Sequence, residues 1–504
     1  MKKVFSILIT LSWLVLPIVA QAALKQRPSM LRLTFEELEL TGNENMGLLG
    51  SSYLVHLNRN LYTGLGIYSA VTGRRGGFFT GGLETGFKKK LGQDWEFDAG
   101  LFVGGGGGGA APQGGGLMIR PHIGLLYKTG IGKLGLQFSQ VDFPNGDINS
   151  KQIALSYEKP LSLLISGRWL QDKRLRSIDS YFIRRNRPAN QDFSLLIQDY
   201  NLPDGTLNTA GDIQDKSMSL IGVEWDYYLN KDMFFRLQPL GALGGGSDGY
   251  ASLLMGLGYR YSITENSSLK LAATLGASGG GQVDTGGGFT TDAAVTLQHR
   301  FNNGLLLGLR AGLVGSPDGD FKANSLGLLI GHSDQAPAKK AFSSSDLKPR
   351  HWRLRATHQT YQPKGDTRRK GQTTPDNRDV HLFGLQTDLF LNRHTYLTGQ
   401  AIGAYDGDAG GYAAGLVGAG FMTPFWENSR LTFNAEALVG AAGGGGLAVG
   451  DGLVSQAMLG VAYRASRSAS LQLDYGLIKS HNGSFQADVI NLSFGLRFST
   501  LTWR

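Results

Sequence analysis

Apolar and polar residues alternate along most of this chain with a period of two. Between 431 and 439 every odd position is apolar, whereas Thr432, Asn434 and Glu436 occupy even positions. Such alternation indicates a β-strand with one apolar face. The runs are about 9 to 12 residues long, which exceeds the average soluble strand and suits a tilted strand that crosses a membrane. Equivalent runs occur earlier in the chain, at 97–103 and 269–275.

The same order of features occurs three times. The pairs that begin at Leu57, Leu229 and Leu391 each end an alternating run with a leucine and an asparagine, and they lie 172 and then 162 residues apart. We divide the chain into repeats at 23–160, 161–347 and 348–504. Each repeat has room for about eight strands, so we expect about 24, within a range of 22 to 26. In the first repeat we place strand starts near Leu31, Leu48, Leu61, Phe78, Trp95, Leu117, Leu134 and Ile148.

We interpret the fold class as all-β, a single antiparallel transmembrane β-barrel formed by residues 23–504. Turns such as 57–60 are short and polar, whereas loops at the opposite strand ends, such as 201–216 and 362–379, are longer. Short turns at one end and long loops at the other are typical of outer-membrane barrels. The region 161–202 could hold two extra strands. The alternative is three eight-stranded barrels in tandem, which we disfavour because only the third repeat ends in an assembly-like strand.

Aromatic residues cluster beside the short turns. An interfacial girdle in a membrane barrel should lie there, although ordinary β-propensity is the alternative explanation. The residues of this predicted girdle are Tyr53, Tyr62, Tyr227, Tyr228, Phe234, Phe235, Phe390, Tyr396 and Trp426.

The first 22 residues have the pattern of a secretory signal peptide. Lys2 and Lys3 precede an apolar stretch, and Ala20-Gln21-Ala22 supplies small residues for cleavage near Ala22. The chain contains no cysteine, which excludes a lipid-modified cysteine and disulfide bonds. We therefore expect export to the cell envelope.

The last strand, from Asn491, resembles the C-terminal assembly signal of Gram-negative outer-membrane β-barrel proteins. Ser493, Gly495 and Phe498 fall at its polar, glycine and aromatic positions, and Trp503 lies next to the end. The chain departs from that class at its final residue, because an arginine stands where an aromatic residue is usual. The resemblance implies localisation in the outer membrane, contact with outer-membrane lipid, and recognition by the barrel assembly machinery.

Glycine supplies 74 of the 504 residues, roughly twice its ordinary frequency. Each repeat carries a glycine-rich hairpin between two strands. Such a hairpin could fold inward as a narrow ribbon that constricts a pore, or dock a partner strand. The alternative is a flexible extracellular loop. The candidate hairpin residues are Gly104, Gly109, Gly114, Gly116, Gly279, Gly286, Gly443 and Gly452.

The strand after each hairpin turns different polar residues toward the predicted lumen. Around a single lumen, three sectors would then present basic, acidic and neutral groups, and charged residues that line a pore tune its selectivity. A solvated interior ladder of ion pairs is the alternative. The lumen-facing candidates are Arg32, Arg120, His122, Asp292, Gln456, Arg353 and Arg355.

The formal net charge is +9, and no nucleic-acid motif occurs, so we expect no nucleic-acid partner. The histidines show no metal-ligand spacing and no base–nucleophile pairing, so we expect no catalytic residue, no metal and no cofactor. We interpret the chain as a non-enzymatic, porin-like transport or export pore. One alternative is a structural barrel that binds an envelope protein or an exported polymer through its glycine-rich hairpins and basic loops. A second alternative is an outer-membrane hydrolase.

Overall fold

The computed structural model describes residues 24–167, 169–170, 188–215, 217–336, 344–364 and 377–503. Apart from one short 3-10 helix, Ser344–Asp346, its elements are strands. They are β1 (Lys25–Leu40), β2 (Glu44–His56), β3 (Leu61–Thr72), β4 (Phe79–Lys90), β5 (Trp95–Gly107), β6 (Leu117–Lys128), β7 (Lys133–Asp142), β8 (Asn149–Ile165), β9 (Gln191–Asn201), β10 (Ser217–Tyr228), β11 (Met233–Ala242), β12 (Ala251–Ser262), β13 (Ser267–Gly279), β14 (Phe289–Arg300), β15 (Leu305–Gly315), β16 (Lys322–Asp334), β17 (Leu347–Pro363), β18 (Val380–Phe390), β19 (Thr395–Asp406), β20 (Ala413–Pro424), β21 (Leu431–Gly443), β22 (Leu453–Tyr463), β23 (Ala469–Ser480) and β24 (Gln486–Trp503).

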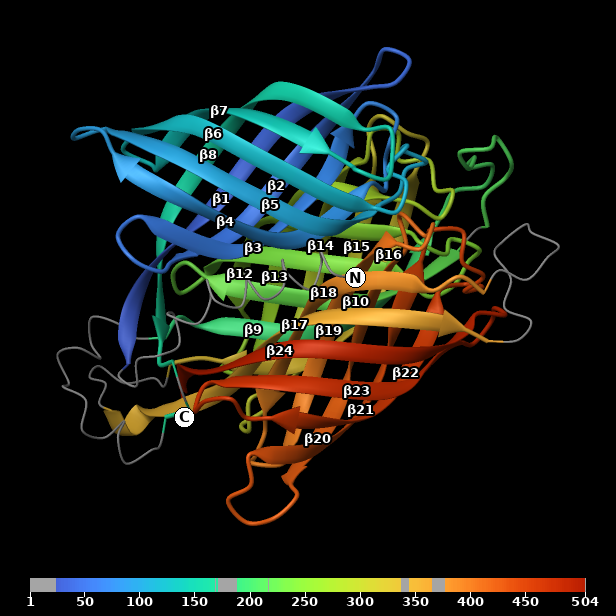
Figure 1. The fold of residues 1–504 in the computed structure, drawn as a ribbon. Helices are drawn as coiled ribbons and strands as arrows, with labels where there is room; N and C mark the ends of the chain where they lie inside the picture. The colour runs from blue at the N-terminus through green and yellow to red at the C-terminus, as the bar shows by residue number, and fades with distance from the viewer. Residues whose placement is uncertain are drawn as a thin grey trace.

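The strands form three closed antiparallel barrels of eight strands each (Figure 1). Barrel 1 contains β1–β8, barrel 2 contains β9–β16, and barrel 3 contains β17–β24. The described residues therefore form the expected 24 antiparallel strands, but the prediction of a single 24-stranded barrel is wrong. Closed antiparallel barrels with an even number of strands are the architecture of the outer-membrane class that the last strand resembles.

Each barrel closes because its first and last strands pair with one another. In barrel 1 the pairing of β1 with β8 runs from Lys25 opposite Ile165 to Glu36 opposite Ala154. Unpaired strand edges are costly in a membrane, so any barrel must pair its outermost strands. An assembly-like final strand is not needed for this pairing, and its absence from the first two repeats therefore did not argue for one large barrel.

The outward faces of the barrels are apolar. On β7, β16 and β23 the outward positions in mid-strand are apolar and rich in leucine, and Leu136, Leu328 and Leu473 are 58%, 63% and 58% exposed. Large apolar patches of this kind on a protein surface mark contact with a membrane or with another protein. The described strands are 10 to 18 residues long, enough for a tilted strand to cross a bilayer.

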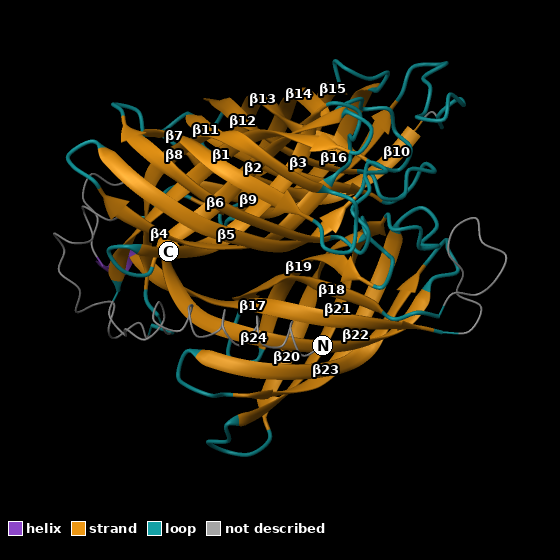
Figure 2. Cartoon of the chain, turned by 45° about the horizontal axis from the view of Figure 1, so that its top comes forward, coloured by secondary structure: helices purple, strands orange, loops and turns teal. Residues whose placement is uncertain are grey.

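The two ends of each barrel differ. The glycine end holds the turns that follow the odd-numbered strands, including the glycine-rich hairpins. The opposite end, here called the short-turn end, holds turns such as 57–60 and both ends of the chain segment that forms each barrel. Figure 2 shows the loops of the glycine ends gathered on one side of the molecule. In the described part of the chain, no helix is long and apolar enough to cross a membrane.

Two further expectations from the sequence concern segments that are only partly described. The signal peptide at 1–22 lies outside the described residues. Of the region 161–202, β8 includes the first five residues and β9 begins at Gln191, and most of the interval between them is not described.

The predicted aromatic girdle is split between the two faces of the barrels. Tyr53, Tyr227 and Trp426 are exposed on the outside at the short-turn end, as a girdle requires. The others, except for the half-buried Phe235, are buried inside the barrels, because the alternation of side chains directs them inward. These interior residues are Tyr62, Tyr228, Phe234, Phe390 and Tyr396.

Candidate functional site: filled interiors and glycine seams

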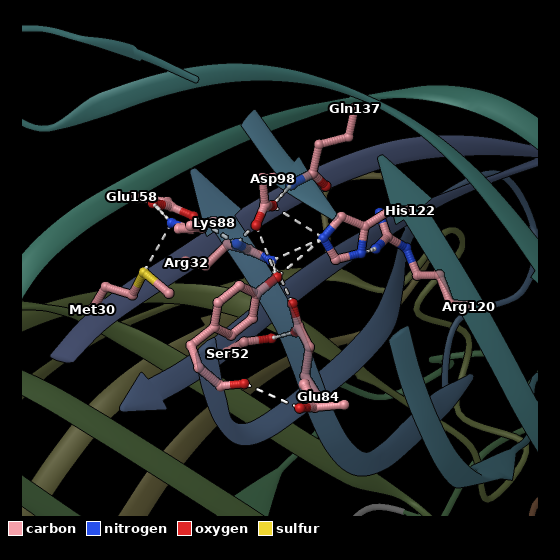
Figure 3. A network of polar contacts seen from close by, with 12 residues as sticks. Met30, Arg32, Ser52, Glu84, Lys88, Asp98, Arg120, His122, Gln137 and Glu158 are labelled. Atoms are coloured by element: carbon pink, nitrogen blue, oxygen red, sulfur yellow. Dashed lines mark hydrogen bonds and ion pairs between the residues drawn. The ribbon is translucent and has the colours of Figure 1, made fainter. Parts of the chain in front are cut away.

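The interior of barrel 1 is organised around Arg32 on β1 (Figure 3). Its guanidinium group donates to Glu84 at 2.5 Å, to Asp98 at 2.8 Å and to Glu158 at 2.7 Å. These carboxylates come from β4, β5 and β8, so the arginine spans the interior and joins strands on several sides of the barrel. The phenol of Tyr62 adds a hydrogen bond to Asp98 at 2.9 Å.

The rest of the polar layer in barrel 1 is also paired. Arg120 donates to Glu36 at 2.6 Å, and His122 lies 3.1 Å from Asp98. Lys88 forms an ion pair with Glu158. Arg120 and His122 are thus where the alternation pattern placed them, inside a barrel, but they contact other side chains of barrel 1 and do not line a wide shared lumen.

Barrel 2 has its own ion-pair layer. Arg236 contacts Asp226 at 2.7 Å and Glu224 at 2.8 Å. The predicted lumen residue Asp292 accepts a 2.6 Å bond from Arg310, which comes from the neighbouring strand β15. Lys270 completes the layer with contacts to Asp226 at 2.8 Å and to Asp192 at 2.6 Å.

In barrel 3 the two predicted arginines are adjacent and share one carboxylate. Arg353 contacts Asp388 at 2.6 Å, and Arg355 contacts Asp388 at 2.8 Å and Glu436 at 2.6 Å. A Cβ on Gly495 of β24 would lie 3.3 Å from both the Cδ of Arg353 and the Cγ of Arg355. The glycine of the assembly-like strand therefore makes room for the two arginine stems. The predicted lumen residue Gln456 is also buried inside this barrel.

Each interior is closed toward the glycine end by apolar side chains. The central contact is an aromatic pair, with ring centroids 5.8 Å apart for Phe78 and Phe143 in barrel 1 and 5.7 Å apart for Tyr250 and Phe321 in barrel 2. The pair in barrel 3 is Tyr412 and Phe485, at 6.2 Å. An eight-stranded barrel is just wide enough for its side chains to fill it. Charged and apolar side chains together fill these three interiors.

The glycine-rich hairpins lie where one barrel meets the next. The turn between β3 and β4 of barrel 1 contacts the β13–β14 hairpin of barrel 2. The amides of Gly76 and Gly77 donate to the carbonyls of Gly286 and Ser278 at 3.0 and 3.1 Å. A Cβ on Gly77 would lie 2.2 Å from the backbone nitrogen of Gly280, so a side chain there would collide with backbone.

Two equivalent contacts complete the set. The turn between β11 and β12 of barrel 2 contacts the hairpin of barrel 3, where a Cβ on Gly443 would lie 2.1 Å from the nitrogen of Gly249. The turn between β19 and β20 of barrel 3 contacts the hairpin of barrel 1, and the amide of Gly411 donates to the carbonyl of Gly106 at 3.3 Å. We call these three contacts the glycine seams.

The glycine seams form a closed ring, because each barrel gives a turn to the next and accepts one from the previous barrel. This is the head-to-tail arrangement of a cyclic trimer, here built within one chain. Glycine is needed at the seams because two backbones approach closely. The hairpins thus dock onto another part of the same protein. The predicted hairpin residues with direct seam contacts are Gly114, Gly116, Gly279, Gly286, Gly443 and Gly452, whereas Gly104 and Gly109 contact their own barrel.

The seam between barrels 2 and 3 can be tested by cross-linking, since the chain has no cysteine of its own. A Cβ on Gly241 would lie 2.8 Å from the Cβ of Ala441. A disulfide needs about 3.5 to 4.5 Å between its Cβ atoms, so the two strand ends must move apart by about 1 Å. With that small shift we expect the double variant Gly241→Cys with Ala441→Cys to form an intramolecular disulfide under mild oxidation, visible as a faster band on a non-reducing gel. As a control, Gly241→Cys is paired with Leu473→Cys, which lies on the outside of β23. This double variant should show no faster band on the gel. Equal yields for both pairs would contradict the seam.

The remaining assembly-signal residues have structural positions at the end of barrel 3. Ser493 faces the interior, and Phe498 of β24 stands opposite Trp352 of β17. Trp503 is buried in an apolar cluster with Leu347 and Leu501, against which residues from the ends of barrels 1 and 2 also pack.

Sequence reasoning pointed to four buried interior arginines, Arg32, Arg120, Arg353 and Arg355, but missed Arg236 and Arg310 of barrel 2 and did not identify the partner carboxylates. Glu84, Asp98 and Glu158 sit at inward positions of alternating strands, so the pattern could have indicated their direction. It could not show that all three converge on Arg32, because that depends on which strands close the barrel.

Comparisons with known proteins identify no family for this chain, since no known protein family and no curated protein matches it. Similar solved structures include a variant of the ferric enterobactin receptor of Pseudomonas aeruginosa, with 11% identity over 95% of this chain and 81% of the receptor, at a TM-score of 0.28. OccK11 of the same organism is 14% identical over 94% of this chain and 96% of OccK11, at a TM-score of 0.22. A designed transmembrane β-barrel is 12% identical over 29% of this chain and 98% of the designed protein, at a TM-score of 0.21. TM-scores this low do not establish a shared arrangement of strands.

Proposed function

We propose that this protein is an integral outer-membrane protein whose three closed barrels form one rigid, membrane-embedded scaffold. The observation that carries the proposal is the combination of apolar outer faces with filled interiors. Apolar side chains on the outside suit lipid, and paired charges inside suit a barrel whose interior is shielded from lipid. The glycine seams then hold three small barrels as one body with a common surface of loops at the glycine end.

The scaffold role is favoured over a transport pore by the dimensions of the barrels. The pore interpretation rested on the wide interior of a barrel with roughly 24 strands, whereas an eight-stranded barrel has room only for side chains or one small ligand. Large side chains such as Arg32, Arg236 and Arg355 lie across the three interiors, each with 1% exposure or less. Transport stays a prediction, and it requires at least one interior to open.

The membrane location is tested by fractionation. We expect the mature protein to sediment with outer membranes, to need detergent for extraction, and to migrate differently on a gel before and after heating. A freely soluble protein with no heat-dependent shift would contradict the proposal.

The closed interiors are tested by electrical recording. We expect the purified, heat-shifting protein to give no stepwise currents in planar bilayers, because the three interiors are filled. A porin reconstituted in the same way serves as the positive control. Regular current steps from the folded protein would contradict the scaffold role and favour the transport interpretation.

A further inference from the structure

The interior wall of barrel 3 carries a strip of neutral polar side chains between its ion-pair layer and its apolar end. Thr357 and Gln359 lie on β17, with Ser493 and Asn491 opposite them on β24. All four side chains are buried, with 1% exposure or less. The strip begins next to Arg355, two residues before Thr357, and ends at the buried Tyr361.

Apart from the amide nitrogen of Asn491, which donates to Asp474 at 2.7 Å, the polar side-chain atoms of this strip have no hydrogen-bond partners among the described residues. They are the hydroxyls of Thr357 and Ser493, both amide atoms of Gln359, and the amide oxygen of Asn491. The Nε and Nη1 atoms of Arg355 and the amide oxygen of Gln456 also have no hydrogen-bond partner. A buried polar group without a partner costs about 1 to 3 kcal/mol, so a group of them in one place requires an explanation.

At the corresponding level of barrel 1 an ion pair and its hydrogen bonds satisfy most polar groups, although Ser156 Oγ and the amide oxygen of Gln152 have no partner. Thr34 stands opposite Ser156 there, as Thr357 stands opposite Ser493. The next inward residue on β1 is Glu36, which accepts hydrogen bonds from Arg120, Ser139 and Gln152. In barrel 3 the neutral Gln359 stands at the position of Glu36. Gln456 on β22 stands at the position that Arg120 occupies on β6 of barrel 1.

The corresponding level of barrel 2 is largely apolar, with one buried amide, Gln198, at the position of Gln359; its oxygen accepts from Arg310 and its nitrogen has no partner. Leu196 stands opposite Leu329, and both belong to the buried apolar cluster of that barrel. The three barrels thus fill the same level in three ways, with an ion pair, with leucines, and with unpartnered neutral polar groups. Among the described residues, single unpartnered polar atoms also occur near this level in barrels 1 and 2, but barrel 3 has the largest group, with hydroxyl, amide and guanidinium atoms together.

We propose that this level of barrel 3 is a binding chamber for a cluster of ordered water molecules. A buried water makes about three hydrogen bonds and needs both donors and acceptors around it. The hydroxyls, amides and free guanidinium edge supply both kinds. An ion is not required, because the charges of Arg353 and Arg355 are balanced by Asp388 and Glu436. Barrel 3 is then the most hydrated of the three barrels.

A structure of the purified protein at better than about 2 Å tests this directly, at a resolution where bridging waters are routinely seen. We expect ordered solvent within hydrogen-bond distance of at least three of the atoms named above, and none between Leu196 and Leu329. A chamber without solvent, or a bound ion in its place, would overturn the proposal.

Thiol chemistry gives a second readout in the cysteine-free chain. We compare Thr357→Cys with Leu196→Cys, which lies at the same level of barrel 2, using a small neutral methanethiosulfonate. A hydrated thiol ionises more readily, so Thr357→Cys should react about tenfold faster or more. Gln359→Glu combined with Gln456→Arg, which rebuilds the ion pair of barrel 1, should abolish that advantage. Equal rates in the two barrels would overturn the proposal, and if a variant does not fold, the solvent structure decides.

Discussion

Replacing Arg32 with methionine should destabilise barrel 1 by about 3 to 5 kcal/mol, or prevent it from folding. The substitution keeps much of the apolar stem but removes the charge that contacts Glu84, Asp98 and Glu158. Three buried carboxylates would then face each other, with Lys88, His122 and Arg120 as the nearby basic side chains. Urea unfolding in detergent micelles, followed by tryptophan fluorescence and the heat-dependent gel shift, measures the effect.

The matched control is Arg59→Met, which removes the same charge from an exposed turn of the same barrel. Its unfolding midpoint should stay close to that of the unmodified protein, because an exposed charge contributes little. A partial rescue is expected from adding Asp98→Asn to Arg32→Met, since one of the uncompensated charges is then removed. If Arg32→Met were as stable as Arg59→Met, the interior charges would be solvated and the barrel would not be filled as described.

The second large effect is expected at the seam between barrels 1 and 2. Gly77→Ala should loosen this seam, because Gly77 has a φ of +86° and its new Cβ would lie 2.2 Å from the nitrogen of Gly280. Displacement of the turn would break the two backbone hydrogen bonds to Gly286 and Ser278. We expect rapid hydrogen exchange at the amides of residues 76 and 77, and an extra loss of about 1 to 3 kcal/mol beyond backbone strain.

Gly42→Ala separates strain from seam contact. Gly42 lies in another turn at the glycine end of barrel 1 with nearly the same φ, +85°, but a Cβ there would have no atom within 4 Å. Both variants incur the left-handed backbone cost of about 1 to 2 kcal/mol. Only Gly77→Ala should also speed hydrogen exchange at the seam amides of residues 76 and 77. Identical exchange in both variants would show that the seam does not form in solution.

Strand positions and directions were predictable from the sequence because they depend on neighbouring residues. The predicted starts near Leu61, Trp95 and Leu117 coincide with the observed starts of β3, β5 and β6. The alternation also indicated that Arg32 and Arg353 point inward, and both are buried inside barrels. The aromatic girdle was only partly right, since proximity to a turn does not say which face of the strand a residue occupies, and Tyr62 and Tyr396 face inward.

The amino-acid sequence by itself determined that the chain forms antiparallel strands with one apolar face, and about how many. It also determined that glycine concentrates at equivalent turns. Only the tertiary structure decided that the strands close after every eighth one and that the glycines join barrel to barrel. Alternation is a local property that is the same for an eight-stranded or a 24-stranded barrel. Closure depends on whether distant side chains, such as Arg32 and Glu158, fit together across a narrow interior, and no local pattern records that fit.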